Sequence, residues 1–104
     1  MKFNLSDYPN SKVVMHVETE EQSLIFRTFL DAQGRTWNSG DSYLELSYFH
    51  VYGSRTCYAF NKREYCNLEY YEAYGYTILN FSDFDWSDLT PSEEDKPIKL
   101  RFTW

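Results

Sequence analysis

The sequence lacks an apolar run that approaches the roughly 18 residues needed to cross a membrane. Its first residues are polar and lack the apolar stretch of a signal peptide, so we expect a cytoplasmic protein. The chain has two cysteines, whereas a structural zinc site takes four ligands. Its two histidines, His16 and His50, have no nucleophile motif beside them. The sequence therefore predicts no metal, no cofactor and no catalytic residue.

Residues 83–95 combine many acidic residues with no lysine or arginine. This stretch holds six of the sixteen acidic residues, and the rest of the chain has ten acidic and ten basic residues. The formal net charge of −6 therefore belongs to this stretch. Its acids are Asp83, Asp85, Asp88, Glu93, Glu94 and Asp95.

Two rings, Phe84 and Trp86, alternate with the first of these acids. A dense negative patch attracts a positively charged partner and repels nucleic acid and anionic membranes. Residues 83–95 therefore predict a surface that binds a basic protein, with the two rings as apolar anchors. A second interpretation stays open, in which the stretch is a solvated loop and both rings fold back onto the sheet.

Calcium binding is a further interpretation of the same acids. Asp83, Asp85 and Asp88 follow one another much as in the first half of a calcium-binding loop. The sixth position of such a loop needs glycine, but here it is Asp88, and the intermediate ligand spacing is wrong. We therefore expect no calcium site.

Aromatic residues make up 20% of the chain, which argues against disorder because disordered segments contain few of them. Large rings bury much surface, so we expect most of them to fill the core or flank a sheet. A second candidate site is a pocket for a small nucleotide. Arg35 would grip a phosphate or carboxylate, and Trp37 would offer a flat face beside Tyr43 and Tyr58. The competing interpretation is a strand edge with a packed tryptophan.

The clearest local signals are a strand followed by a helix. Residues 12–18 are apolar and β-branched, as is typical of a strand. Thr19 and Gln22 form a capping box, so a helix should begin there and continue to about Ala32. Gly34 is a natural stop for this helix.

A hairpin is predicted over residues 55–66. If Asn61 and Lys62 form its turn, facing residues have numbers that sum to 123. Cys57 and Cys66 meet this condition and should be directly opposed. They are either two small half-buried thiols or a redox-sensitive pair.

The remaining elements complete one α+β domain over residues 1–104. They are a short strand at 35–37, an extended stretch at 43–49, a short helix after Asn67, a strand at 76–81 and a last strand at 98–104. We therefore expect a single, mostly antiparallel sheet with one main helix packed on one face and a short second helical turn. The last strand could also pair between two chains and make the protein self-associate.

These motifs together resemble small uncharacterised proteins encoded by bacteriophages and prophages. The resemblance spans residues 13–84 and is carried by the first strand and capped helix, by Arg35-Thr36-Trp37-Asn38-Ser39-Gly40-Asp41, by Thr56-Cys57-Tyr58 and by residues 75–84. It implies no catalytic residues. Small acidic phage proteins often inhibit host defence by occupying the basic nucleic-acid groove of a nuclease. The resemblance therefore implies an anti-defence inhibitor, such as an anti-CRISPR or anti-restriction protein, that mimics nucleic acid in the host cytoplasm.

The sequence thus predicts a non-enzymatic protein with one of two binding functions. The first is inhibition of a host nuclease, or of another nucleic-acid-binding protein, through the acidic stretch. The alternative is binding or sequestration of a nucleotide in an aromatic pocket. Added salt would weaken the first interaction, whereas a bound nucleotide would raise the thermal stability of the protein.

Overall fold

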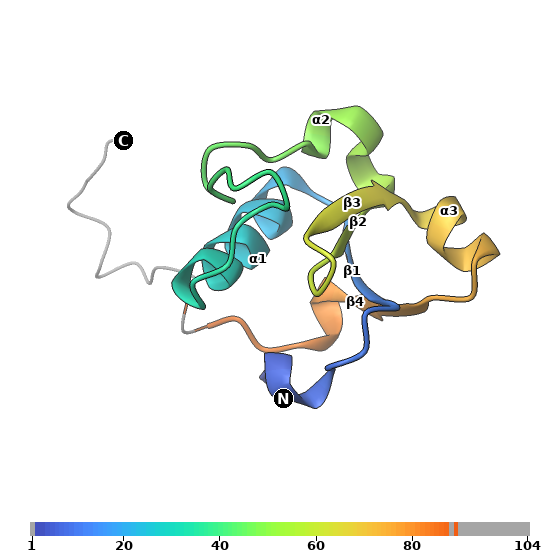
Figure 1. The fold of residues 1–104 in the computed structure, drawn as a ribbon, viewed down its shortest axis with the longest axis horizontal. Helices are drawn as coiled ribbons and strands as arrows, with labels where there is room; N and C mark the ends of the chain where they lie inside the picture. The colour runs from blue at the N-terminus through green and yellow to red at the C-terminus, as the bar shows by residue number, and fades with distance from the viewer. Residues whose placement is uncertain (1, 88, 90–104) are drawn as a thin grey trace.

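The computed structural model describes residues 2–87 and 89. Four strands form one mixed sheet in the order β3-β2-β1-β4, with helices on both sides of it (Figure 1). The strands are β1 (Val13–Val17), β2 (Thr56–Ala59), β3 (Glu64–Asn67) and β4 (Thr77–Asn80). The helices are α1 (Glu20–Ala32), α2 (Phe49–Tyr52) and α3 (Leu68–Ala73), and 3-10 turns lie at Leu5–Asp7, Gly53–Arg55 and Phe81–Asp83. The predicted α+β fold with one main helix is confirmed.

β1 lies inside the sheet, antiparallel to β2 and parallel to β4. Its odd-numbered residues belong to the larger core cluster, together with Phe26 and Leu30 of α1. Val14 faces the other side of the sheet, in a smaller cluster that includes Tyr71 of α3. Both faces of this strand are therefore covered, which explains why its sequence is nearly continuously apolar instead of alternating.

α1 begins and ends where the sequence predicts. The Thr19 hydroxyl accepts a hydrogen bond from the Gln22 amide at 3.1 Å. The Gln22 side chain in turn accepts one from the Glu18 amide at 2.8 Å, so two amides at the helix start are satisfied. Gly34 follows the helix with a φ of 79°, a left-handed conformation that costs glycine little.

The hairpin of β2 and β3 has the predicted register. Cys57 faces Cys66, and both are free thiols. The turn is longer than the two residues expected, because strand pairing already ends at Ala59. The amides of Lys62 and Arg63 both donate to the Ala59 carbonyl, at 3.1 and 2.7 Å. Arg63 reverses the chain with a φ of 61°, and this longer turn keeps the same register.

The extended stretch expected at residues 43–49 is wrong, since turns occupy it and α2 begins at its end. Side chains make the hydrogen bonds that a neighbouring strand would otherwise make. Arg27 donates to the Tyr43 carbonyl at 2.9 Å, and the Trp37 indole donates to the Leu46 carbonyl at 2.9 Å. This loop is therefore held by residues distant in sequence.

Two other predicted strands differ in outcome. The strand expected at 35–37 is reduced to a single bridge between Thr36 and Ser42. The last strand, at 98–104, and its use in self-association lie outside the described residues.

The short helix after Asn67 is confirmed as α3. No helix in the described part of the chain is long and apolar enough to cross a membrane.

Candidate functional site

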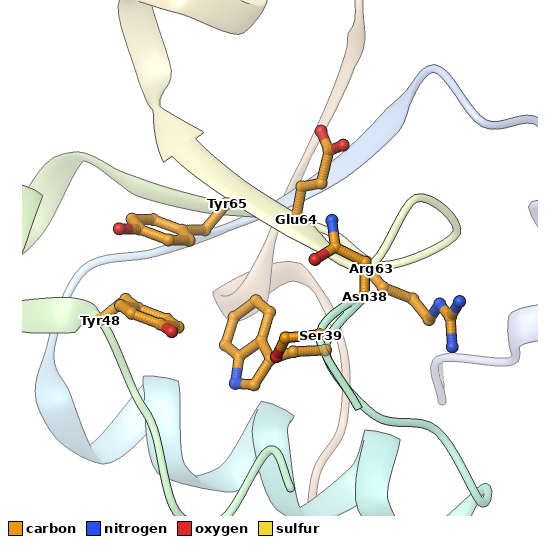
Figure 2. Close-up of a pocket in the computed structure, with 7 residues that line it drawn as sticks. Asn38, Ser39, Tyr48, Arg63, Glu64 and Tyr65 are labelled. Atoms are coloured by element: carbon orange, nitrogen blue, oxygen red, sulfur yellow. The ribbon is translucent and has the colours of Figure 1, made fainter. Parts of the chain in front are cut away.

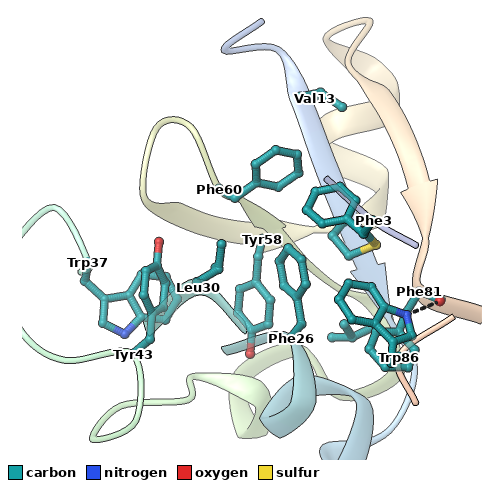
Figure 3. Packing of buried hydrophobic residues seen from close by; sticks show 12 residues of the cluster. Phe3, Val13, Phe26, Leu30, Trp37, Tyr43, Tyr58, Phe60, Phe81 and Trp86 are labelled. Carbon is teal, nitrogen blue, oxygen red and sulfur yellow. Dashed lines mark hydrogen bonds between the residues drawn. The ribbon is translucent and has the colours of Figure 1, made fainter. Parts of the chain in front are cut away.

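The acidic stretch of residues 83–95 does not present its rings to solvent. Trp86 is 7% exposed, and its indole nitrogen donates a hydrogen bond to the Phe81 carbonyl at 2.8 Å (Figure 3). The Trp86 and Phe81 rings stack with their centroids 4.7 Å apart. Phe84 is half-buried, and its ring centroid lies 5.4 Å from that of Phe3. The prediction that Phe84 and Trp86 are exposed anchors is therefore wrong.

These rings turn inward because the chain after β4 crosses an apolar surface of α1. Phe26 and Phe29 of α1 each have a ring centroid 5.7 Å from that of Trp86. Full burial of one large apolar side chain stabilises a fold by about 1.5–3 kcal/mol. The rings therefore serve the core, as in the interpretation in which they fold back onto the protein.

The carboxylates of the same stretch stay outside. Asp83 and Asp85 are exposed. The Ser87 amide donates to Asp85 at 2.9 Å, and this hydrogen bond lowers the pKa of the carboxyl. The other four predicted binding acids, Asp88, Glu93, Glu94 and Asp95, lie outside the described residues. The acidic surface thus keeps charge at two described positions and loses its aromatic anchors.

Three of the four residues predicted to line a nucleotide pocket have other roles. Tyr43 and Tyr58 are fully buried core residues. Arg35 donates two hydrogen bonds of 3.1 Å to the hairpin turn, one of them to the Asn61 side chain. Its guanidinium therefore ties the loop after α1 to the hairpin. Trp37 alone among the four lines the pocket described next.

A pocket of about 320 Å³ opens where the loop after α1 meets the hairpin (Figure 2). The aromatic pocket, as we call it, is lined by Trp37, Asn38, Ser39, Tyr48, Arg63, Glu64 and Tyr65. Figure 2 shows Tyr48 and Tyr65 on one side, with Asn38 and Arg63 on the other. Pockets for small ligands measure about 300–1,000 Å³, so this one has the size for a small ligand.

Three rings form one wall of the aromatic pocket. Tyr48 and Tyr65 stack with centroids 4.4 Å apart and planes 8° from parallel. The Trp37 ring meets both edge-on, at 5.0 Å from Tyr48 and 5.9 Å from Tyr65. The hydrogen bond from the Trp37 indole to the Leu46 carbonyl also fixes the indole. The wall is therefore rigid before any ligand arrives.

The backbone of the pocket is held in an unfavourable conformation. Tyr48 and Arg63, with φ values of 57° and 61°, are the two non-glycine residues of the described chain that have a positive φ. Such a conformation costs a non-glycine residue about 1–3 kcal/mol. The Asn38 amide donates to the Arg63 carbonyl at 3.1 Å, which joins two segments of the pocket. Both strained residues of the described chain thus line one pocket.

A buried hydroxyl lies behind the aromatic wall. The ring of Tyr43 packs 4.5 Å from that of Trp37. The Tyr43 hydroxyl is buried and has no hydrogen-bond partner among the described residues. Burial raises its pKa to about 12, and the nearby charges of Arg35 and Arg63 partly oppose that rise. The hydroxyl stays protonated at neutral pH and does not compete with a ligand as an anion.

Sequence reasoning missed most of the aromatic pocket. Arg63 and Tyr65 lie on the hairpin, whereas Tyr48 precedes α2 and Trp37 follows α1, and no local motif joins these three segments. The hairpin register was a usable signal, because it places Tyr65 opposite Tyr58 on one face of the sheet. The positive φ of Arg63 had no such signal, since arginine is not a residue that favours it.

The two histidines lie in different settings. His16 is tied into the fold, with its Nε2 2.8 Å from the Ser54 carbonyl oxygen and its Nδ1 3.4 Å from the Asn80 amide oxygen. His50 is exposed on α2. Within residues 2–87 and 89, no group of three His, Cys, Asp or Glu side chains could hold a metal ion.

Comparison with known proteins adds no assignment. No family model matches the chain, and neither a curated protein nor a solved structure matches it. The resemblance to phage and prophage proteins therefore stays a prediction. Function has to be argued from the geometry of the pocket and from the exposed surface.

Proposed function

We propose that the protein binds a small planar ligand that carries an anionic group, of the kind represented by a nucleotide, in the aromatic pocket. The ligand ring would lie against the wall formed by Trp37, Tyr48 and Tyr65. Its anionic group would lie on the opposite side, where Arg63 supplies a guanidinium with five N–H donors. The proposal keeps the ligand class predicted from the sequence and replaces most of the predicted residues.

One observation carries the proposal: both positive-φ non-glycine residues of the described chain line this pocket. Strained backbone persists only where the surrounding structure enforces it, and such residues cluster at ligand sites. Glycine or asparagine would relieve the strain at Arg63 without any change of fold. An arginine in this conformation is best explained by a ligand that its side chain contacts.

The lining also favours binding over reaction. None of the seven lining residues is a histidine or a cysteine. Asn38 and Ser39 supply neutral polar groups, and stacked rings supply a flat apolar surface. Rings of this kind attract any planar base, so the polar side chains would decide which ligand is preferred.

A thermal-shift screen with nucleoside monophosphates and aromatic carboxylates tests the proposal. A ligand present at about 100 times its Kd stabilises the folded protein by about 2.7 kcal/mol, which raises the melting temperature measurably. Arg63→Gly should weaken binding by about tenfold or more, because a charge-assisted hydrogen bond is worth about 1.5–3 kcal/mol. Lys62→Ala removes a neighbouring charge outside the pocket and should bind like the wild type.

Either of two results would reject the pocket as a ligand site. One is the absence of stabilisation by any compound of the screen. The other is equal stabilisation of the wild type and of Arg63→Gly by the compound that binds.

The predicted inhibitor function remains a second candidate, supported by fewer residues than the sequence suggested. We propose that exposed carboxylates hold a basic protein surface, such as the nucleic-acid groove of a host nuclease. The supporting observation is that Asp83 and Asp85 are both exposed, while Phe84 between them is half-buried and Trp86 after them is buried. The lowered pKa of Asp85 keeps that carboxylate charged over a wide pH range.

Binding to purified host nucleases at increasing salt tests this second candidate. Asp83→Asn/Asp85→Asn should weaken binding, because long-range attraction between charges falls as salt screens them. Asp7→Asn/Glu45→Gln alters two exposed acids elsewhere and serves as the matched control. Binding that is indifferent to salt and to the first variant would exclude the acidic surface.

A further inference from the structure

Two thiols of the protein face each other across the hairpin. Cys57 of β2 and Cys66 of β3 are directly opposed in the antiparallel pair. Both lie on the α3 side of the sheet, because Cys57 belongs to the smaller core cluster and Cys66 packs against that cluster. Opposed residues of antiparallel strands have Cα atoms about 4.5 or 5.5 Å apart. A disulfide joins residues whose Cα atoms are about 4.4–6.8 Å apart, so the backbone already suits a bridge.

Contacts outside the two strands keep the cysteines in register. The Arg35 guanidinium donates to the Phe60 carbonyl and to the Asn61 side chain, both at 3.1 Å. On the other side of the turn, the Asn38 amide donates to the Arg63 carbonyl at 3.1 Å. The loop after α1 therefore holds both sides of the turn, and the strands cannot slide past each other without breaking these bonds.

The two sulfur atoms differ in their access to solvent. Cys57 is fully buried, whereas Cys66 is half-buried. The Cys66 thiol also donates to the Tyr52 hydroxyl, with the sulfur and oxygen atoms 4.0 Å apart. A reagent from solution therefore reaches Cys66 first. The chain has two cysteines, so Cys57 is the one partner that Cys66 can find within the same molecule.

We propose that Cys57 and Cys66 form a reversible disulfide through exchange with a small disulfide of the glutathione type. The Cys66 thiolate attacks one sulfur of that compound and forms a mixed disulfide, and one half of the compound leaves as a thiolate that takes up a proton. The Cys57 thiol then loses its proton, and its sulfur attacks the Cys66 sulfur. This step forms the protein disulfide and releases the second half as a thiol. Two protein thiols are thus oxidised, and one small disulfide is reduced to two thiols.

The burial of Cys57 sets the pace of the second step. It raises the pKa of Cys57 from 9.0 to about 12, so the thiolate is scarce at neutral pH. The second step is therefore slower than the first. A mixed disulfide on Cys66 should appear before the protein disulfide does.

The geometry of the strands also makes the bridge reversible. Opposed residues have Cβ atoms about 4.5–5.5 Å apart, whereas a disulfide holds them about 3.5–4.5 Å apart. The bridge must therefore draw the two strands slightly together. A strained disulfide is reduced more easily than a relaxed one, so an excess of thiol should reopen it.

The two cysteines and the aromatic pocket lie on opposite faces of the hairpin. Tyr58 and Tyr65, the neighbours of the cysteines along the strands, pack into the larger core cluster on the α1 side. Tyr65 belongs to the wall of the aromatic pocket, which therefore lies on that side as well. The disulfide proposal thus does not depend on ligand binding in the pocket.

Intact-mass spectrometry of the reduced full chain, in buffers of stepped oxidised-to-reduced glutathione ratio, tests the proposal. After an acid quench, the free thiols would be alkylated in denaturant so that the buried Cys57 also reacts. We expect the wild type to lose the mass of two hydrogen atoms and both alkylation sites at oxidising ratios, and to regain both thiols at reducing ratios. The oxidised protein should keep its near-ultraviolet circular dichroism and melt at a higher temperature than the reduced one, because the cross-link restricts the unfolded chain.

Cys57→Ala and Cys66→Ala are the matched variants. Cys57→Ala should stop at the mixed disulfide on Cys66, and Cys66→Ala should keep the Cys57 thiol free. The proposal would be overturned if the wild type kept two free thiols at the most oxidising ratio or ended at the mixed disulfide. It would also be overturned by a disulfide that joins two chains, or by one that forms only as the circular dichroism signal is lost, since the unfolded chain would then be the reactant.

Discussion

At the scale of single residues, Arg63 lowers the stability of the backbone, while its side chain is the proposed contact of the ligand. Its left-handed conformation, with a φ of 61°, disfavours any side chain with a Cβ atom. Arg63→Gly should therefore unfold at a guanidinium concentration equal to or higher than the wild type needs, with a gain of up to about 1 kcal/mol. Lys62→Gly, in the same turn, is the control and should lose stability. A clear loss of stability in Arg63→Gly would show that the arginine serves the fold.

A second residue-scale prediction concerns the alkaline limit of stability. Burial raises the pKa of Cys57 from 9.0 to about 12, and it raises that of Tyr43 from 10.0 to about 12. The folded protein keeps these protons at pH values where the unfolded chain has lost them. Their contribution to the free energy of unfolding is therefore complete below about pH 9 and is lost as the pH rises towards 12.

Denaturant unfolding at stepped pH values measures this decline. The free energy of unfolding should be level up to about pH 9 and then fall steadily. Cys57→Ala removes one of the responsible groups, so its curve should fall less steeply than that of the wild type. A wild-type curve that stays level, or a variant curve of equal slope, would contradict this cause.

Residue-scale prediction from sequence worked where a simple register rule applies. The opposition of Cys57 and Cys66 followed from the hairpin alone, and the structure confirms it. The placement of Trp86 failed because its burial depends on Phe26 and Phe29, which are distant in sequence. A sequence in which acidic and aromatic residues alternate does not show which of these side chains the fold will bury.

At the scale of elements, the segment after β4 closes the core on the α1 side. Trp86→Ala should lower the free energy of unfolding by about 3–5 kcal/mol, since it empties a buried indole site. Asp85→Asn, one residue earlier and exposed, should change it by less than about 0.5 kcal/mol. Thermal and denaturant unfolding of the two variants would measure the contrast. Equal, small effects would mean that this ring is not part of the core.

The helices show which elements can be predicted from sequence. α1 was predictable because its cap, its apolar stripe and its stop all lie within one segment. α3 was predictable for the same reason, since the Asn67 side chain accepts a hydrogen bond from the Tyr70 amide at 2.7 Å. The loop between α1 and α2 was not, because its carbonyls are paired with the Arg27 and Trp37 side chains. Arg27 lies on α1 and Trp37 within the loop itself, and each reaches its carbonyl, 16 and 9 residues away, only once the chain has folded.

At the scale of the whole molecule, the sheet separates two core clusters of unequal size. The aromatic pocket lies with the larger cluster, which contains residues of α1, and α3 packs on the smaller cluster of the opposite face. Of the six acids that suggested a basic partner, two lie in the described part of the chain. The class of fold was predictable from sequence, whereas the pocket requires three segments that only the tertiary structure brings together.

Nuclear magnetic resonance of the tryptophan indole groups tests whether a nucleotide binds in the aromatic pocket. The nucleoside monophosphate that stabilises the protein best would be titrated into the labelled full chain. We expect a saturable shift of the Trp37 indole signal, which Arg63→Gly weakens, while the signal of the buried Trp86 stays in place. An unchanged Trp37 signal at saturating nucleotide would contradict the claim that the aromatic pocket is a ligand site.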